Sequence, residues 1–441
     1  MLNPCFLKRE GGEMNYLIKG GKIVDPSQGF ERIANILVVD GIIESIDPDS
    51  VPDGVETIDA SGKLVFPGLV DIHVHAREPG EEYKETIETA SMAAAAGGFT
   101  TIVTMANTKP PIDTADRVRF VYERAENASV HVYPVGAVSK ELSGEQLAEM
   151  ADMAESGAVA FSDDGNPIAN PELMRNALAY ADQLELPILV HEVDPVLASG
   201  GQIHEGEAAS ISGLRGIPSQ AETAMIFRDI ELLKLSGGRL HIQHVTVEGS
   251  IELIRQAKLA GMAVTCEVTP HHLLLTDMDV VNSGFDSNFK VMPPLRSERD
   301  RQALLEALVD GTIDAIATDH APHALHEKDN PFEIAPFGIV GLETALSLVW
   351  TNFVEKGIIS PIRMVELMST MPAKILELPA GSLAKGMVAD ITVFDPDARW
   401  VVKPENFYSR SRNTPFEGLE LKGKVALTMV AGEIVYKSQT V

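Results

Sequence analysis

Two histidines, His73 and His75, stand at the end of an apolar run and are separated by a single residue. Alternate side chains of an extended strand point to the same face, so the two imidazoles are expected to project together. Two neutral ring nitrogens on one face suit a metal ion. The same pattern also fits two polar residues on a half-buried strand, so the interpretation depends on the rest of the chain.

The segments around this pair alternate between strand-like and helix-like patterns. Short β-branched runs predict eight strands, at residues 68–73, 100–105, 131–135, 158–161, 187–191, 240–245, 263–268 and 313–319. Amphipathic stretches of helical length separate them, at residues 82–96, 115–128, 144–155, 171–184, 221–235, 250–259 and 299–309. Strands that alternate with helices over about 250 residues are typical of a (β/α)8 barrel. We therefore expect an α/β chain built on a TIM-type barrel.

Both ends of the chain have a different character. Glycine-containing turns separate short strands in residues 15–58, and the C-terminal runs at 390–394 and 425–436 have the same pattern. We expect the two ends to pair into one small β-sandwich domain. The expected division is a dispensable extension at 1–13, the small domain at 14–64 and 380–441, and the barrel at 65–379.

Composition excludes several kinds of partner. The chain has 441 residues, with 64 acidic against 36 basic side chains and a net charge of -28, which would repel phosphate backbones and anionic lipid. No apolar run approaches the roughly 20 residues that span a bilayer, and residues 1–12 lack the core of a signal peptide. The expectation is a cytoplasmic protein without nucleic-acid or membrane partners. The only cysteines, Cys5 and Cys266, are too few for a disulfide framework, and Cys266 fits a packed strand position.

Metal-capable residues recur at the ends of the predicted strands, where the active site of such a barrel lies. They are His73 and His75, one of the adjacent pair Asp163 and Asp164, His191, His244 and Asp319. Independent core histidines would not all fall at the same end of their strands. Three other histidines fit structural or peripheral roles by their positions: His131, His241 and His320. Spacing alone does not choose between Asp163 and Asp164.

Several motifs together resemble those of bacterial dihydroorotases, a family of the amidohydrolase superfamily. The matching segments are residues 73–80 (HVHAREPG), 105–108 (MANT), 161–165 (FSDDG), 267–273 (EVTPHHL), 317–323 (ATDHAPH) and 335–344 (APFGIVGLET). The resemblance extends over nearly the whole chain from Met14 onward. It implies reversible hydrolysis of the dihydroorotate ring to N-carbamoyl-L-aspartate, a step of pyrimidine biosynthesis.

Mixed imidazole and carboxylate ligands suit zinc, and six of them are more than one tetrahedral ion needs. Two ions about 3.5–4 Å apart would use all six, so we expect two Zn²⁺ per chain. Many relatives bridge the ions with a carbamylated lysine after strand four, but residues 160–164 contain no lysine. A carboxylate must then bridge; the resemblance favours Asp164 and leaves Asp163 to a turn or supporting role.

The expected chemistry assigns three further roles. Asp319 can accept a proton from the attacking water and return it to the leaving amide nitrogen. Arg77 suits a bidentate pair with a substrate carboxylate, and it lies on the face of His73 and His75 if the strand persists. By resemblance, the other substrate-binding residues are His75, Asn107, His323 and the backbone of Phe337 and Gly338. The loop at 324–336 fits either a lid or an ordinary solvated loop.

Two positions depart from the family pattern. Ala106 stands where relatives often have proline, and Met292 stands where they commonly have an asparagine that binds the substrate. Two other functions stay open: a cyclic amidase for hydantoins, dihydropyrimidines or allantoin, or a non-catalytic scaffold that binds aspartate transcarbamoylase. The family also suggests a homodimer and that same transcarbamoylase as a partner.

Overall fold

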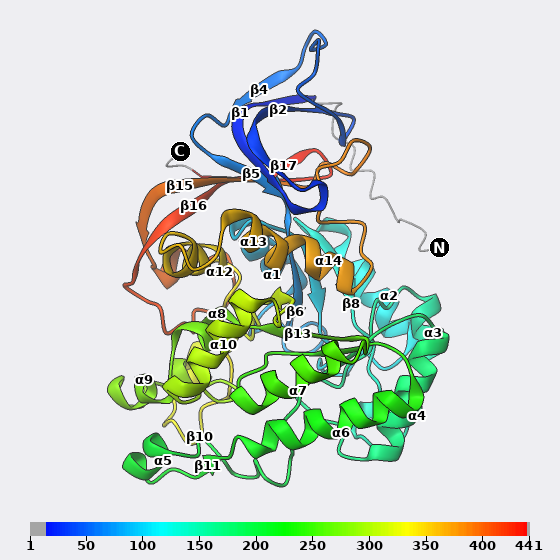
Figure 1. Cartoon of the computed structure of the whole chain (residues 1–441), viewed down its shortest axis with the longest axis vertical. Helices are drawn as coiled ribbons and strands as arrows, with labels where there is room; N and C mark the ends of the chain where they lie inside the picture. Colours follow the sequence, from blue (N-terminus) through cyan, green and yellow to red (C-terminus); the bar gives the residue numbers. More distant parts are fainter. Residues whose placement is uncertain (1–14, 439–441) are drawn as a thin grey trace.

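The computed structural model describes residues 15–438 and comprises a barrel with a smaller sheet domain above it (Figure 1). The extension expected at 1–13, with Cys5, and Met14 lie outside the described residues. Within the described part of the chain, no helix combines the length and the apolar character needed to cross a bilayer.

The sheet domain joins both ends of the chain, as expected. Its strands are β1 (Tyr16–Asp25), β2 (Phe30–Val39), β3 (Ile42–Ile46), β4 (Glu56–Asp59), β5 (Leu64–Pro67), β15 (Ile391–Val401), β16 (Glu420–Val430) and β17 (Glu433–Lys437). They follow the order β17-β16-β15-β5-β1-β2-β3, and β4 pairs with β1. The two ends meet where β5 pairs antiparallel with β15, with Pro67 opposite Ile391. Apolar residues of both segments share one core, including Ile18, Ile36 and Met429.

The barrel strands follow the predicted order. They are β6 (Leu69–Val74), β7 (Phe99–Thr104), β8 (His131–Pro134), β9 (Ile188–Val190), β12 (Leu240–Ile242), β13 (Val264–Val268) and β14 (Ala315–Ile316). The fourth strand is shorter than predicted. Within the described residues it is reduced to Phe161, which forms isolated bridges with Gly136 and Ile188. The last strand is also shorter than predicted, and a parallel bridge between Val74 and His320 closes the ring.

Helices surround the barrel strands (Figure 1). The principal ones are α1 (Ile87–Ala96), α2 (Ala115–Arg124), α3 (Met150–Glu155), α4 (Pro171–Gln183), α6 (Gln220–Ser236), α7 (Glu248–Leu259) and α10 (Glu298–Asp310). Shorter elements are β10 (Ile203–His204), α5 (Glu207–Ser212), β11 (Gly216–Ile217), α8 (Pro270–Leu274), α9 (Asp277–Asn282), α11 (Leu325–Lys328), α12 (Ala345–Val349), α13 (Pro361–Val365) and α14 (Met371–Ile375). Local sequence defines their starts: Asn170 caps α4 just before Pro171, and Thr86 forms a capping box at α1.

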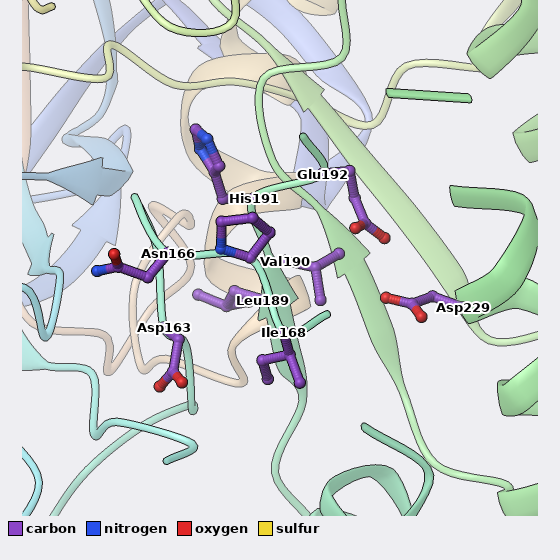
Figure 2. A pocket seen from close by; sticks show the side chains of 9 residues that line it. Asp163, Asn166, Ile168, Leu189, Val190, His191, Glu192 and Asp229 are labelled. Atoms are coloured by element: carbon purple, nitrogen blue, oxygen red, sulfur yellow. The ribbon is translucent and has the colours of Figure 1, made fainter. Parts of the chain in front are cut away.

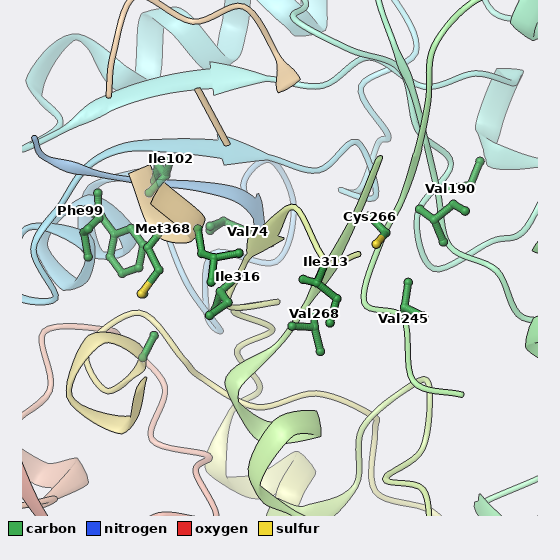
Figure 3. Packing of buried hydrophobic residues seen from close by; sticks show 14 of the residues in the cluster. Val74, Phe99, Ile102, Val190, Val245, Cys266, Val268, Ile313, Ile316 and Met368 are labelled. Atoms are coloured by element: carbon green, nitrogen blue, oxygen red, sulfur yellow. The ribbon is translucent and has the colours of Figure 1, made fainter. Parts of the chain in front are cut away.

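Alternation along the strands divides the apolar side chains between two cores. Val190 and Ile316 pack outward against the helices (Figure 3), whereas the adjacent Leu189 and Ala315 pack into the barrel interior. Cys266 belongs to the outer core, and burial raises the pKa of its thiol to about 12. This packing on both faces fixes the strand ends that carry the polar cluster described below.

One segment of the sheet domain leaves the sheet and reaches the barrel, a feature that the sequence pattern did not predict. Residues 402–419 connect β15 to β16 and contact the barrel. The buried carboxylate of Glu85 accepts hydrogen bonds from the Ser409 hydroxyl and, at 3.0 Å, from the Arg410 N–H. The Ser411 hydroxyl donates to the carbonyl oxygen of Lys84 at 2.7 Å.

The junction of the two ends also depends on Asp25, a fully buried residue at the end of β1. Its Oδ2 accepts the Leu383 N–H at 2.8 Å, and its Oδ1 accepts the Ser27 N–H at 2.9 Å. Asp25→Ala leaves both donors unpaired, so we expect it to lower the free energy of unfolding by about 1–3 kcal/mol, measured by thermal or denaturant melting.

The matched control is Asp59→Ala, since Asp59 is exposed and accepts the nearby Ser61 N–H at 2.9 Å. We expect a change within about 0.5 kcal/mol for that variant. Equal melting of the Asp25 variant and the unmodified protein would contradict the role of Asp25 at the junction.

Candidate metal centre and substrate site

Six side chains predicted as metal ligands meet at the carboxyl ends of the barrel strands. His73 lies on β6 and His75 just beyond it; the others follow the bridge at Phe161, β9, β12 and β14. These four are Asp164, His191, His244 and Asp319. All six residues are buried. The strand order of the barrel therefore brings residues separated by up to 246 positions into one cluster.

The carboxylate of Asp164 lies between two pairs of imidazoles. Its Oδ2 is 3.3 Å from Nε2 of His75 and 3.5 Å from Nε2 of His73. Its Oδ1 is 3.2 Å from Nδ1 of His191 and 3.7 Å from Nε2 of His244. Each oxygen thus faces a different pair of rings, as a carboxylate shared by two cations requires.

Asp319 completes one side of this cluster. Its Oδ1 lies 3.0 Å from Nε2 of His75 and 3.6 Å from Nε2 of His73. The donor atoms of His73, His75 and Asp319 all lie within 4.8 Å of one another, and so do those of His73, Asp164 and His244. Both groups are therefore compact enough to hold an ion.

Unpaired polar atoms show that the donor set fits a cation. Among the described residues, Nε2 of His73 and Oδ1 of Asp164 are buried without a hydrogen-bond partner. Leaving such an atom unsatisfied costs about 1–3 kcal/mol, which a bound cation would offset. Nδ1 of His191 also lies only 2.8 Å from Nε2 of His244, so two ring nitrogens converge on one point.

A buried carboxylate orients His73 from behind. Oε1 of Glu267, on β13, lies 2.6 Å from Nδ1 of His73, and its Oε2 lies 3.1 Å from Nε2 of His241. Holding the Nδ1 proton leaves the Nε2 lone pair of His73 for the cluster. Sequence reasoning quoted Glu267 in a motif but gave it no role. His241 has the structural position expected for it.

Charge in the cluster favours ionised carboxylates. Burial alone would lower the pKa of His73, but the surrounding carboxylates, first that of Asp164, outweigh it and raise this pKa well above its usual range. Burial would raise the pKa of Asp319, and the nearby imidazoles, first that of His73, lower it instead. The pKa of Asp164 is likewise held well below its usual range. Both aspartates are therefore available as ligands near neutral pH.

Strained backbone marks the same strand ends. Arg77, His244 and Asp319 have φ angles of 59°, 29° and 47°, a region that non-glycine residues rarely adopt. Such strain persists where surrounding structure enforces it, commonly at functional sites. Here it occurs at three of the predicted site residues.

Asp163 points away from the cluster and joins two loops. It accepts the N–H groups of Val138 and Ser139 at 2.8 and 3.0 Å, and the Ser139 hydroxyl. Burial raises its pKa to about 6. Of the adjacent aspartates, the structure therefore brings only Asp164 to the imidazoles.

A small cavity lies beside His191 and is lined by Asp163, Asn166, Pro167, Ile168, Leu189, Val190, Glu192 and Asp229 as well (Figure 2). Glu192 and Asp229 face each other there, and burial together with the Asp229 carboxylate raises the pKa of Glu192 well above its usual range. Neither residue of this acidic pair belongs to the six-residue cluster.

Arg77 reaches the substrate side of the cluster by a different route from the one expected. Strand β6 ends at Val74, so the condition under which Arg77 would share the face of His73 and His75, a persisting strand, is not met. A left-handed turn instead directs its guanidinium to the carbonyl oxygen of Pro322 at 3.2 Å, with Nη2 3.4 Å from Nε2 of His323. Nδ1 of His75 lies 2.9 Å from Oδ1 of Asn107. Asn107 thus contacts the cluster through His75, while Arg77 lies against His323 and feels the charges of Asp319 and Asp164.

The backbone at Phe337 and Gly338 lies against His323. Nε2 of His323 is 2.8 Å from the Phe337 carbonyl oxygen. Gly338 donates its N–H to the Lys290 carbonyl at 2.9 Å, and its own carbonyl accepts from Nζ of Lys328 and Nδ2 of Asn413, both at 3.0 Å. Sequence reasoning missed Lys290, Lys328 and Asn413, because their roles arise from contacts between distant loops.

The loop at 324–336 is anchored at several points. Nζ of Lys328 also binds the Pro336 carbonyl at 3.0 Å, and Nζ of Lys290 binds those of Phe332 and Ala335 at 2.6 and 2.7 Å. Burial lowers the pKa of Lys328 to about 7 and that of Lys290 to about 8.

The departure at Met292 places an apolar side chain in a neighbouring cluster. Met292 is partly buried against the group formed by Val193, Ile217 and Ala221. Its thioether therefore adds packing where an asparagine would add hydrogen bonds.

Comparison with known proteins gives related sequences over nearly the full length. A family model described as dihydro-orotase-like matches residues 62–250. A dihydroorotase from Pelotomaculum thermopropionicum is 49% identical over 428 residues, which cover 97% of this chain and 100% of that protein. A dihydroorotase from Geobacter metallireducens is 48% identical over 426 residues, which cover 96% of this chain and 100% of that protein.

Solved structures share the two-lobed architecture. The L-hydantoinase (dihydropyrimidinase) from Arthrobacter aurescens matches with a TM-score of 0.87 and 31% identity, covering 96% of both chains. A D-hydantoinase (dihydropyrimidinase) from Thermus sp. matches with a TM-score of 0.81 and 26% identity, covering 96% of this chain and 95% of that one.

Glu267→Gln tests whether the carboxylate behind His73 supports metal binding. The amide lacks the charge that holds the Nδ1 proton, so we expect metal affinity to fall by about 10–100-fold, measured by competition with a chromogenic chelator. Glu222→Gln is the matched control, since the buried Glu222 accepts the Thr246 and Val247 N–H groups at 3.0 and 3.2 Å instead. Equal affinities of both variants would contradict the role of Glu267.

Proposed function

The chain belongs to the dihydroorotase family of the amidohydrolase superfamily, and we propose that it hydrolyses the cyclic amide of (S)-dihydroorotate reversibly to N-carbamoyl-L-aspartate. As a member of that family it is a metal-dependent hydrolase of cyclic amides. The observation that carries the proposal is that Arg77 lies against His323 and close enough to the cluster for the charges of Asp319 and Asp164 to act on it. A cationic group next to a hydrolytic centre suits a cyclic amide that also bears a carboxylate.

Two zinc ions are proposed for the cluster, with Asp164 shared between them because its oxygens face different imidazole pairs. The proposed ligands are His73, His75, Asp164, His191, His244 and Asp319. When bound, the ions supply a water of lowered pKa and positive charge for the amide oxygen.

Asp319 is proposed as the catalytic acid and base. Its carboxylate stays ionised near neutral pH, because the imidazoles around it lower its pKa. It can accept the proton of the attacking water and later donate that proton to the leaving ring nitrogen. In the reverse direction it takes the proton from the same nitrogen.

Substrate orientation is assigned to the side chains next to the cluster. Arg77 can bind the substrate carboxylate with His323 beside it, and Asn107 is proposed to add a donor from its position against His75 at the edge of the metal centre. Burial, followed by the positive charges of Arg77 and its neighbours, lowers the pKa of His323 to about 2, so this ring is neutral. Phe337 is proposed to contact the ring of the substrate; the backbone polar groups of Gly338 are already engaged by protein partners.

A hydantoinase-type activity is the second candidate, favoured by the likeness to the Arthrobacter aurescens L-hydantoinase. Hydantoins and dihydropyrimidines lack the carboxylate that would engage Arg77. A non-catalytic scaffold would have no need for six buried metal-ligand side chains. A homodimer, an aspartate transcarbamoylase partner and a cytoplasmic location stay predictions.

Turnover and metal content test the function together. We expect about two zinc ions per chain and ring opening of dihydroorotate. Asp319→Asn should lower kcat by about 10²–10⁴-fold, because the amide cannot transfer the proton. Assays of product formation and metal analysis of both proteins check these outcomes.

Asp314→Asn is the control, since Asp314 precedes the same strand at its other end and accepts the Cys266 N–H at 2.8 Å. Its kcat should stay within about threefold of the unmodified protein, as expected for a change outside the reacting groups. Strong turnover of hydantoin with none of dihydroorotate would overturn the proposal in favour of the second candidate.

Arg77→Met tests recognition of the carboxylate. A charge-assisted hydrogen bond contributes about 1.5–3 kcal/mol, so KM for dihydroorotate should rise by about 10–100-fold while metal content is unchanged. Arg117→Met is the control, because Arg117, on α2, binds the Pro111 carbonyl at 3.0 Å and not a group of the proposed substrate site. An unchanged KM in the Arg77 variant would remove that residue from the substrate site.

A further inference from the structure

The connection between β15 and β16 brings a side chain of the sheet-domain lobe to the mouth of the barrel. This side chain, Asn413, is buried, with 5% of its surface exposed. It lies next to two loops that carry predicted substrate-binding groups, the loop after β14 with His323 and the loop with Phe337 and Gly338. No argument from the sequence gave Asn413 a role.

The side-chain amide and the backbone carbonyl of Asn413 are hydrogen-bonded to these two loops. Its Oδ1 accepts the backbone N–H of His323 at 3.1 Å. Its Nδ2 donates to the carbonyl oxygens of Gly338 at 3.0 Å and Ala321 at 3.3 Å. Its own carbonyl accepts the Val340 N–H at 2.9 Å. The side-chain amide thus makes three contacts with the two loops, and the backbone carbonyl adds a fourth.

The imidazole of His323 depends on both loops. Its backbone is held by Asn413, and its Nε2 lies 2.8 Å from the Phe337 carbonyl oxygen. The position of the ring relative to Arg77 therefore follows from the separation of the two loops. Removing the amide would leave the His323 N–H and the Ala321 carbonyl unpaired and would take one of two donors from the Gly338 carbonyl, which Lys328 also binds.

Lys328 supports the same arrangement. Its Nζ and Nδ2 of Asn413 both donate to the Gly338 carbonyl, each at 3.0 Å. This carbonyl is thereby fixed by the amine of Lys328 and the amide of Asn413, which come from separate segments of the chain. Asn413 differs from Lys328 in also contacting the His323 backbone directly.

We propose that Asn413 is a positioning residue that holds His323 and the Phe337–Gly338 backbone in register for binding of the substrate carboxylate. This inference rests on the proposed function. Asn413 touches no reacting atom and acts through His323, so its loss affects substrate binding more than the chemical step.

Asn413→Ala should raise KM for dihydroorotate by about tenfold and change kcat by less than about threefold, with metal content unchanged. The decisive measurement is a double-mutant cycle with His323→Ala. If Asn413 acts through His323, adding Asn413→Ala to the His323 variant should change KM by less than about twofold. Fully additive effects on KM, or an unchanged KM in the single variant, would overturn the inference.

Ser411→Ala is the matched control. Ser411 lies in the same segment, is buried and donates to the Lys84 carbonyl at 2.7 Å, away from both loops. We expect this variant to melt at a lower temperature without a change in KM. A KM increase equal to that of Asn413→Ala would show a general loosening of the segment and would overturn the inference.

Asn413→Asp provides a second variant if the alanine protein does not fold. It keeps the volume and the acceptor for the His323 N–H but loses both donations to carbonyl groups, and KM should rise by about threefold or more. An unchanged KM would overturn the inference. If the unmodified protein does not turn over dihydroorotate, the proposed function fails; if it does and KM of the Asn413 variants is unchanged, only the inference fails.

Discussion

The fully desolvated carboxylate of Asp164 is the interaction on which the site depends. An ionised carboxylate is costly to bury unless opposite charges surround it. Here two pairs of imidazoles face its two oxygens, and the charge of His73 is the largest factor that offsets burial. Because the compensation comes from several strands, none of these side chains can be placed independently of the barrel.

The barrel meets this requirement by making strand ends rigid. Apolar side chains pack on both faces of the strands, so the residues that follow each strand emerge at fixed positions. At His244 and Asp319 the backbone also adopts positive φ angles, which the surrounding packing must enforce. Glu267 orients the ring of His73 through its Nδ1. Asn413, in the connection between β15 and β16, holds the backbone of His323.

Local sequence patterns were sufficient for the order of strands and helices and for five of the six residues in the cluster. Strand ends in a barrel converge, so residues such as His73 and His191 could be assigned to one place without long-range information. The choice between Asp163 and Asp164 could not be made from spacing, since it depends on which carboxylate the Val138 and Ser139 N–H groups engage. A strand that persisted past His75 would have put Arg77 on the face of the histidines, but the strand ends at Val74 and Arg77 adopts a positive φ instead.

Asn413 and Lys328 could not be predicted at all, since their partners lie in loops whose approach is set by tertiary packing. The β15–β16 connection therefore has a consequence for how such chains diverge. If homologous genes exchanged their C-terminal strands, residue 413 would come from one parent and the barrel loops that it contacts would come from the other. A functional chimera would have to take residues 402–419 and residues 319–340 from the same parent. The boundary between the barrel and the sheet domain would therefore be a poor crossover point.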